Sequence, residues 1–293
     1  MPDFLTRLGN SGVLVADGAT GTMLQQAGLP AGAAPERWNL ENPDAIIDLH
    51  RAYIDAGADI ILTNTFGGTR IRLSQDMADP DAVVINRRAA ELARQAAGER
   101  VIVFGDMGPT GQMLPPLGLQ TYKETAEAFA EQAGALEAGG ADAILIETMS
   151  DLYEAKAALE GAREATSLPV IVSFSFDMHG RTMMGLHPED AARAMWELEV
   201  DVIGANCGRT LTETLTAIEK MRAVIPEAVL LAKPNAGLPH REDGKFVYDV
   251  TPEIMGEYAL KFADTGVKIF GGCCGSSPAH IKAAADVLKG RNR

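Results

Sequence analysis

The sequence predicts an α/β protein, a single (β/α)8 TIM barrel that spans residues 1–293 as one domain. Short, β-rich apolar runs recur eight times along the chain. Longer segments with helical periodicity, rich in Ala, Glu and Lys, separate these runs. The length of 293 residues suits a barrel, which typically has about 250 residues plus loop insertions. An open, doubly wound sheet is the alternative, but it usually has fewer strands.

The predicted strands are runs of Val, Ile, Leu, Ala and Phe that reach a turn or a polar residue. In order they are VLVADG (13–18), ADIILTNTF (58–66), VIVFGDMG (101–108), ADAILIET (141–148), PVIVSFSF (169–176), VDVIGANC (200–207), AVLLAKPNA (228–236) and VKIFGGCC (267–274). Amphipathic stretches between them, such as 43–57, 122–140 and 211–226, predict helices that mostly end at Gly or Pro. No low-complexity tract or linker interrupts the pattern, so we expect one domain.

Charge and hydropathy exclude several classes of partner. The formal net charge is −14 and the isoelectric point is about 4.8, and no segment clusters Lys and Arg as a nucleic-acid or anionic-membrane surface requires. Apolar runs such as 228–232 fall far short of the roughly 20 residues of a membrane span. The first twelve residues lack the apolar core of a signal peptide. We therefore expect a cytoplasmic protein with no nucleic-acid or membrane partner.

Polar side chains stand at the carboxyl end of most predicted strands. In a barrel these ends meet at one mouth, where active sites form. The residues are Asp17 and Gly18, Thr63 to Phe66, Glu147 and Thr148, Ser173 and Ser175, Asn206 and Cys207, Asn235, and Cys273 and Cys274. A polar strand end that merely meets water explains any one of them, but the whole set favours a functional mouth.

The chain has three cysteines, and all of them stand at such strand ends. An odd count in a reducing compartment argues against a disulfide framework. Three thiolates suit zinc with an open fourth position, although a thiol nucleophile and plain burial remain open readings. His280 is a weaker candidate for a fourth ligand, because the Ser-Pro before it starts a helix that leaves the mouth.

The turn DGATGTM (17–23) follows the first strand. Its backbone N–H groups could hold a carboxylate or phosphate, although a plain turn fits as well, and the Gly-x-Gly-x-x-Gly spacing of a dinucleotide site is absent. Asp17 and Glu147, at nearby strand ends, could pair with an ammonium group. An anion seat, two carboxylates and a soft-metal site describe a pocket for an amino acid that carries a thiol.

The motifs DGATGTM, AGADIILTNTF, GADAILIET, GANCG, KPNAG and GGCCG together resemble the homocysteine S-methyltransferase family over residues 12–288. Within it the chain is most similar to the homocysteine-binding barrel of cobalamin-dependent methionine synthase, and it is also similar to betaine–homocysteine methyltransferase. The resemblance implies a zinc-dependent enzyme that forms methionine. It implies zinc ligation by Cys207, Cys273 and Cys274.

The same resemblance implies the substrate contacts. Asp17 and Glu147 would bind the homocysteine amino group, and the Gly18-Ala19-Thr20 backbone would bind its carboxylate. Asn235 would lie close to the metal. Ser173 and Asn206, at neighbouring strand ends, complete the substrate-binding residues that we expect.

The methyl donor is the open question. The methionine synthases that the barrel resembles carry folate and corrinoid modules on the same chain, and 293 residues leave no room for them. We therefore expect methylcobalamin, or another methyl-corrinoid, on a separate corrinoid protein, admitted by a rim of Gly67, Gly68 and the loop 108–121.

Two alternatives remain. A small onium donor (betaine, dimethylsulfoniopropionate or S-methylmethionine) would need aromatic walls. Phe66 supplies half of the aromatic pair found in betaine-using relatives, and Trp38 could line the mouth. From another class, a non-catalytic zinc barrel could dock a corrinoid protein, but it would not need Asp17 and Glu147.

Overall fold

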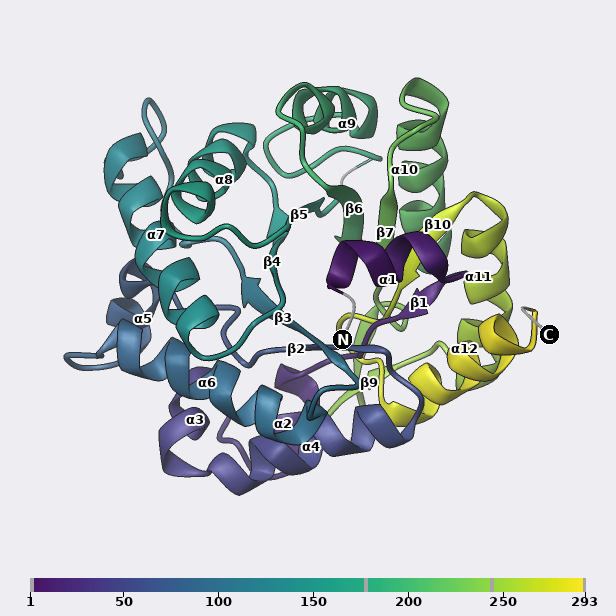
Figure 1. Cartoon of the computed structure of the whole chain (residues 1–293), viewed down its shortest axis with the longest axis horizontal. Coiled ribbons are helices and arrows are strands. Elements are labelled where there is room, and N and C mark those ends of the chain that lie inside the picture. The colour runs from purple at the N-terminus through teal and green to yellow at the C-terminus, as the bar shows by residue number, and fades with distance from the viewer. Residues whose placement is uncertain (1–2, 177–178, 243–244, 292–293) are drawn as a thin grey trace.

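The computed structural model describes residues 3–176, 179–242 and 245–291, and within them eight parallel strands form one sheet. The strand order is β1-β10-β7-β6-β5-β4-β3-β2. A parallel bridge between Ala16 and Ile60 joins the two end strands, so the sheet closes into a barrel with helices around it (Figure 1). The predicted (β/α)8 TIM barrel is confirmed. The outermost residues of the predicted domain, 1–2 and 292–293, lie outside the described residues.

Seven of the eight barrel strands fall inside the predicted runs, and β4 extends one residue beyond its run, to Met149. The eight strands are β1 (Leu14–Val15), β2 (Ile60–Leu62), β3 (Ile102–Met107), β4 (Ala143–Met149), β5 (Val170–Phe174), β6 (Val202–Cys207), β7 (Leu230–Pro234) and β10 (Val267–Phe270). Several end earlier than predicted, because the chain leaves the sheet to build the mouth. A second sheet of β8 (Pro239–Glu242) and β9 (Lys245–Tyr248) was not predicted.

The helices lie outside the barrel, apart from α1 at one end. They are α1 (Phe4–Asn10), α2 (Gly21–Gln26), the 3₁₀ turn η1 (Pro35–Arg37), α3 (Trp38–Glu41), α4 (Pro43–Asp55), α5 (Arg70–Asp76), α6 (Ala82–Ala97), α7 (Tyr122–Ala138), α8 (Leu152–Ala165), α9 (Pro188–Glu197), α10 (Leu211–Val224), α11 (Pro252–Asp264) and α12 (Pro278–Gly290). The stretches predicted at 43–57, 122–140 and 211–226 correspond to α4, α7 and α10. Side-chain caps begin many of them, including a capping box between Thr121 and Glu124 at α7. Within the described ranges, no helix combines the length and apolarity of a membrane span.

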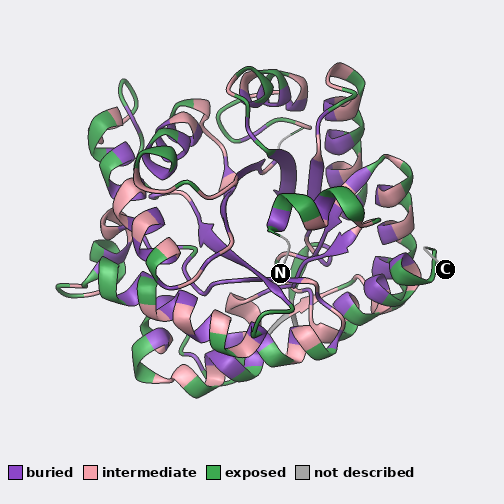
Figure 2. Ribbon diagram, viewed as in Figure 1, coloured by how far each residue is buried: buried purple, intermediate pink, exposed green. Residues whose placement is uncertain are grey.

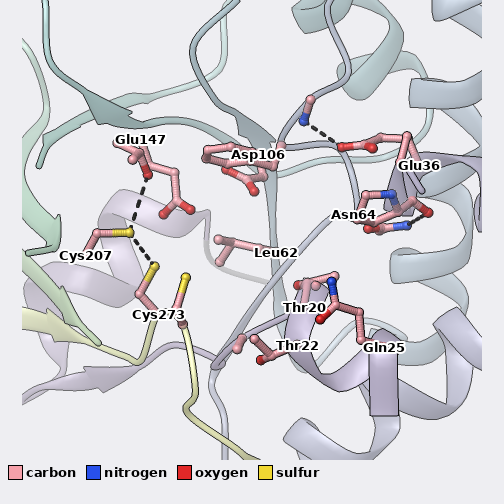
Figure 3. Close-up of a pocket in the computed structure, with 18 of the residues that line it drawn as sticks. Thr20, Thr22, Gln25, Glu36, Leu62, Asn64, Asp106, Glu147, Cys207 and Cys273 are labelled. Atoms are coloured by element: carbon pink, nitrogen blue, oxygen red, sulfur yellow. Dashed lines mark hydrogen bonds between the residues drawn. The ribbon is translucent and has the colours of Figure 1, made fainter. Parts of the chain in front are cut away.

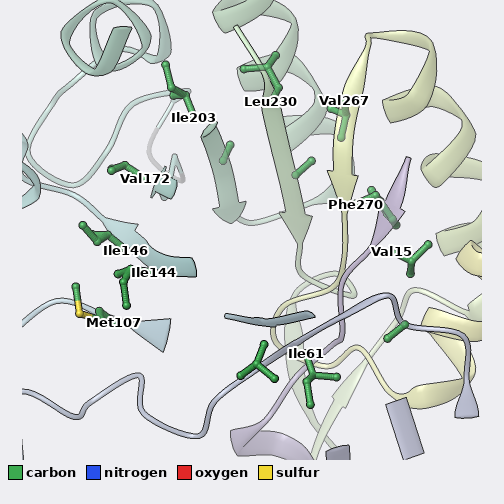
Figure 4. Close-up of a cluster of buried hydrophobic side chains, with 14 of the residues drawn as sticks. Val15, Ile61, Met107, Ile144, Ile146, Val172, Ile203, Leu230, Val267 and Phe270 are labelled. Carbon is green, nitrogen blue, oxygen red and sulfur yellow. The ribbon is translucent and has the colours of Figure 1, made fainter. Parts of the chain in front are cut away.

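Alternation along the strands produces two apolar layers. Residues such as Leu14 and Phe104 fill the barrel interior, while their neighbours Val15 and Val103 pack outward against the helices. Figure 4 shows part of the outer layer, and Figure 2 shows that the barrel strands are buried along most of their length while the helices expose their outer faces. Both layers are closed to water, which leaves the two ends of the barrel as the places where the strands can meet solvent.

Helix α1 covers the end of the barrel where the strands begin (Figure 1). Phe4 and Leu8 are buried and belong to the interior cluster. The Phe4 ring meets Phe104 edge-on, with centroids 5.0 Å apart and an interplanar angle of 84°. The helix therefore completes the core at its bottom.

Aspartates also organise this bottom end. Asp59, Asp142 and Asp201 directly precede strands β2, β4 and β6. Each accepts a hydrogen bond from a backbone N–H near the start of the neighbouring strand. The donors are Val15 of β1 at 3.0 Å, Val103 of β3 at 2.7 Å and Val170 of β5 at 2.9 Å. Asp59 also pairs with Lys289 at 2.9 Å, and Asp142 pairs with Arg94 at 2.6 Å. Each of these carboxylates thus holds its own strand beside the preceding one.

Candidate functional site

The three cysteines meet at the opposite end, the mouth. Cys207 is the last residue of β6, and Cys273 and Cys274 follow β10. The three sulfur atoms lie within 4.8 Å of one another, and Cys207 Sγ is 2.9 Å from Cys273 Sγ (Figure 3). Backbone bonds fix the second pair to β7: Cys273 N–H donates to the Pro234 carbonyl, and Ala236 N–H donates to the Cys274 carbonyl, each at 2.9 Å. Segments 66 residues apart in sequence thereby form one sulfur cluster.

The protonation of the cluster suits a soft metal ion. Hydrogen bonds from Cys207 and Cys273 lower the pKa of Cys274 to about 3. The hydrogen bond with Cys273, the one with Cys274 and burial hold the pKa of Cys207 well above its usual range. The three sulfurs therefore share protons rather than all ionising together. A zinc ion would replace those protons and accept three thiolates at about 2.3 Å, so the residues present fit zinc.

Two further residues considered as ligands are already bonded. His280 Nδ1 accepts from Ser277 N–H at 3.1 Å, and Nε2 is 2.8 Å from the Val250 carbonyl oxygen, so both ring nitrogens already have partners. Asn235 Nδ2 donates to the Gly208 carbonyl at 2.7 Å, while its Oδ1 is buried and has no hydrogen-bond partner among the described residues. His280 thus stays in its helix cap, and Asn235 keeps one unused acceptor beside the loop that follows Cys207.

Four buried ionisable side chains lie next to the sulfurs. Lys233 Nζ, on β7, is 2.7 Å from Glu147 Oε2, on β4, and their side chains are only 2% and 7% exposed. Asp17 and Asp106 are buried beside them at the ends of β1 and β3. Asp17 Oδ2 accepts from Leu62 N–H at 2.8 Å, and one carboxyl oxygen of each aspartate has no partner among the described residues. Three carboxyl groups thus share one lysine.

Burial and neighbouring charges shift the pKa values of all four side chains. Burial raises the pKa of Asp17 to about 7 and raises the pKa of Glu147. Burial and the charge of Glu147 raise the pKa of Asp106 well above its usual range. Lys233 stays protonated because Glu147, Asp106 and Asp17 raise its pKa against the opposing effect of burial. The pocket can therefore accept a second cation, which would ionise the remaining carboxyl groups.

The turn after β1 is packed tightly. A Cβ at Gly18 would lie 2.6 Å from the Ser276 carbonyl oxygen and 2.9 Å from the Tyr53 ring, so glycine is required there. Ala19 N–H already donates to the Ser276 carbonyl at 3.0 Å. Tyr53 Oη contacts the carbonyls of Ala19 and Ser276 at 2.7 and 2.9 Å. A carboxylate at this turn would thus have to use the N–H groups on either side of Ala19.

A cavity of about 460 Å³ connects the turn, the charged groups and the sulfurs. Figure 3 shows the cysteines and Glu147 at one end, Asp106 and Leu62 in the middle, and Gln25, Glu36 and Asn64 at the other. The predicted site residues that line it are Gly18, Ala19, Thr20, Phe66, Glu147, Cys207, Cys273 and Cys274. Its described lining does not include Asp17, Trp38, Ser173, Asn206 or Asn235.

Sequence reasoning missed Lys233 and Asp106, both of which line the cavity. Each follows an apolar run at a strand end, which is the signal that could have identified them. The predicted rim differs as well. Gly67 and Gly68 are buried, and Gly67 N–H donates to Glu36 at 2.6 Å, so they form a bonded wall instead of an open edge. In the loop 108–121, Met113, Leu117 and Leu119 are exposed.

Comparisons with known proteins show which sequences and structures this chain is similar to. The family model described as Homocysteine S-methyltransferase matches residues 14–288. Methionine synthase from Mycobacterium leprae is 37% identical over 295 residues, which cover 93% of this chain, and methionine synthase from Mycobacterium tuberculosis is 36% identical. The chain spans about a quarter, 24%, of the length of both relatives.

Among solved structures, the metallated homocysteine methyltransferase MmuM from Escherichia coli superposes with a TM-score of 0.81 at 21% identity. The match covers 96% of this chain and 98% of that one. A methyltransferase from Methanosarcina mazei gives a TM-score of 0.64 at 14% identity, covering 99% and 98%. At these identities the two structures show a shared fold.

Proposed function

This chain belongs to the homocysteine S-methyltransferase family, and from that premise we propose that it is a zinc-dependent enzyme that forms methionine from homocysteine. The observation that carries the proposal is the cluster of three thiols in the lining of a cavity that also holds an unbalanced set of carboxyl groups. We propose that residues 1–293 act as one homocysteine-binding domain.

In this proposal Cys207, Cys273 and Cys274 hold the zinc ion. Zinc bound by three thiolates lowers the pKa of a substrate thiol at its fourth position and keeps that sulfur electron-rich. The thiol proton would be lost to solvent on binding; the new sulfur–carbon bond would then form as the bond between the methyl carbon and its donor breaks, with the electron pair of that bond left on the donor. The barrel contributes orientation, because the sulfur ligands and the amino-acid contacts come from a rigid set of strand ends.

The substrate's amino group supplies the second cation that the pocket lacks. We propose that it binds between Glu147 and Asp17. Among the described residues, Lys233 is the one basic side chain that acts on both of these carboxyl groups. The carboxylate of homocysteine would bind the Gly18-Ala19-Thr20 turn through the N–H groups on either side of Ala19, whose own N–H donates to Ser276. Ser173, Asn206 and Asn235 would act from outside the cavity lining, behind the metal and substrate.

For the methyl donor we propose a methyl-corrinoid carried by a separate protein. The similarity to methionine synthases supports it, as does the exposed apolar loop 108–121 at the mouth. A small onium donor is the second candidate. It is favoured by one observation, the partly exposed ring of Phe66 in the cavity lining. The half-buried Trp38 packs against the core and gives that candidate no second wall in the described lining.

The decisive experiment combines metal analysis with a donor panel. Purified protein should contain about one zinc per chain, should bind homocysteine by calorimetry, and should form methionine from homocysteine and free methylcobalamin. Little turnover with betaine, dimethylsulfoniopropionate or S-methylmethionine is expected. Efficient use of one of these onium donors, with no reaction from methylcobalamin, would overturn the corrinoid proposal. Zinc without homocysteine binding would favour the non-catalytic docking barrel.

A further inference from the structure

Asn206 ties together three neighbouring strand ends just behind the sulfur cluster. Its Oδ1 accepts from Thr148 N–H on β4 at 2.8 Å and from Ser173 Oγ on β5 at 2.6 Å. Its Nδ2 donates to Thr148 Oγ1 at 2.7 Å and lies 3.6 Å from Cys207 Sγ. Asn206 is only 1% exposed, so water does not compete for these bonds. We call Asn206, Thr148 and Ser173 the asparagine clamp.

The clamp holds two residues in a backbone conformation that they would not adopt by preference. Thr148 has φ +62° and Cys207 has φ +57°. The left-handed region is uncommon for residues other than glycine, and a β-branched residue there is an outlier that the surroundings must enforce. Thr148 lies in β4 one residue before Met149, which pairs with Phe174 of β5. The bonds between Asn206 and both the N–H and the hydroxyl of Thr148 add to that constraint.

The backbone after Cys207 is held from the other side. Thr214 Oγ1 donates to the Cys207 carbonyl at 3.1 Å, and Asn235 Nδ2 donates to the Gly208 carbonyl at 2.7 Å. Gly208 also has a positive φ, +73°. Consecutive left-handed residues turn the chain sharply at the end of β6. That turn leaves the Cys207 sulfur within reach of Cys273 and Cys274.

We propose that Asn206 is a positioning residue for the metal centre. Through Thr148 and its own backbone it fixes Cys207 in the left-handed conformation, and its Nδ2–H donates to the Cys207 sulfur. This inference rests on the proposed zinc site and changes the role expected for Asn206, from a substrate contact to a support of a metal ligand. Hydrogen bonds behind a ligand orient it and strengthen metal binding.

The test measures metal binding without turnover. In Asn206→Leu, a near-isosteric change, zinc affinity measured by chelator competition should fall about 10- to 100-fold. The charge-transfer band of the cobalt(II)-substituted protein, which reports cobalt–sulfur bonds, should weaken or shift. Thr148→Val, which keeps the β-branch and loses the hydroxyl, should show the same effect to a smaller extent. Thr148→Ser, which keeps the hydroxyl, should retain zinc affinity within a factor of about three.

The controls separate this inference from the zinc proposal. If wild-type protein binds neither zinc nor cobalt, the proposed metal site itself fails. If wild type binds metal, and Asn206→Leu and Thr148→Val match it in affinity and cobalt spectrum, the positioning role is overturned. Should Asn206→Leu fail to fold by circular dichroism, the Thr148→Val and Thr148→Ser pair decides alone. Equal affinities in that pair would likewise reject the clamp.

Discussion

The two ends of this barrel use aspartate in opposite ways. At the bottom, Asp59 and Asp142 each accept a backbone N–H and pair with a basic side chain, and Asp201 accepts a backbone N–H. At the mouth, Asp17 and Asp106 are buried, and each keeps an oxygen without a partner in the described structure. Bonded carboxylates hold strands together, whereas under-bonded ones leave binding capacity for a ligand. We therefore expect changes at the mouth to impair function, and changes at the bottom to alter stability without impairing function.

The largest expected effect is at the mouth. Cys273→Ser should remove most of the bound zinc and abolish methionine formation, because a hydroxyl is a far weaker zinc ligand than a thiolate. The melting curve of the metal-free variant should match that of metal-free wild type, since the core does not depend on the cluster. Plasma emission spectrometry measures the bound zinc, and a methionine assay measures the activity. Full activity in this variant would refute the zinc mechanism.

A second test compares ion pairs from the two ends. Lys233→Met strands Glu147 in a buried site and should lower the free energy of unfolding by about 3–5 kcal/mol. The double change Lys233→Met with Glu147→Gln should recover much of that loss and should bind homocysteine poorly. At the bottom, Lys289→Met breaks the exposed pair with Asp59 and should cost less than about 1 kcal/mol. Equal losses for the two single changes, in urea melts, would erase the distinction between the ends.

The reverse case is a bottom change that spares the mouth. Phe4→Ala removes the ring that packs on Phe104 and should destabilise the protein by about 3 kcal/mol. Zinc content and homocysteine affinity at low temperature should not change. Leu5→Ala, on the exposed side of the same helix, is the matched control and should have little effect. Loss of zinc in folded Phe4→Ala would show that the two ends are coupled.

A pH-dependent effect concerns the helical shell and is smallest near neutral pH. His50 is buried on α4, and burial lowers its pKa to about 4. Because the unfolded chain binds a proton more readily, the stability that neutral His50 maintains is present above about pH 6.5 and is lost as the pH falls toward 4, by up to about 1.4 kcal/mol per unit. His50→Leu should flatten this part of the stability profile measured by denaturant melts at pH 4.5–7.5. An unchanged acid slope would assign it to other groups.

Much of the mouth could be predicted because strand ends in a barrel converge by topology. The meeting of Cys207 with Cys273 and Cys274 needed only the strand order and the apolar pattern. Lys233 was missed because lysine is almost never buried without a partner, and its partner Glu147 stands 86 residues away. The pairing of β8 with β9 was missed because Pro239–Glu242 has no apolar run of the kind that predicted the barrel strands.

Other features had no sequence signal at all. The positive φ angles of Thr148 and Cys207 contradict the preferences of both residue types, so only their surroundings explain them. The Ala19 N–H donates to the Ser276 carbonyl and is therefore not free to bind a ligand. This bond joins two loops that lie 257 residues apart in sequence, so no local pattern predicts it. Backbone geometry at the mouth, rather than residue identity, was the part that required the structure.

The aspartates at the bottom have a consequence for how the chain assembles. Each bond from Asp59, Asp142 or Asp201 exists only when a strand lies in one particular alignment with its neighbour. A slip by one residue would break the bond and would also exchange the side chains of the interior with those of the outer layer. These three carboxylates therefore help to specify the register of the strand pairs β1–β2, β3–β4 and β5–β6 during folding. They discriminate against misregistered barrels that would bury nearly the same apolar surface.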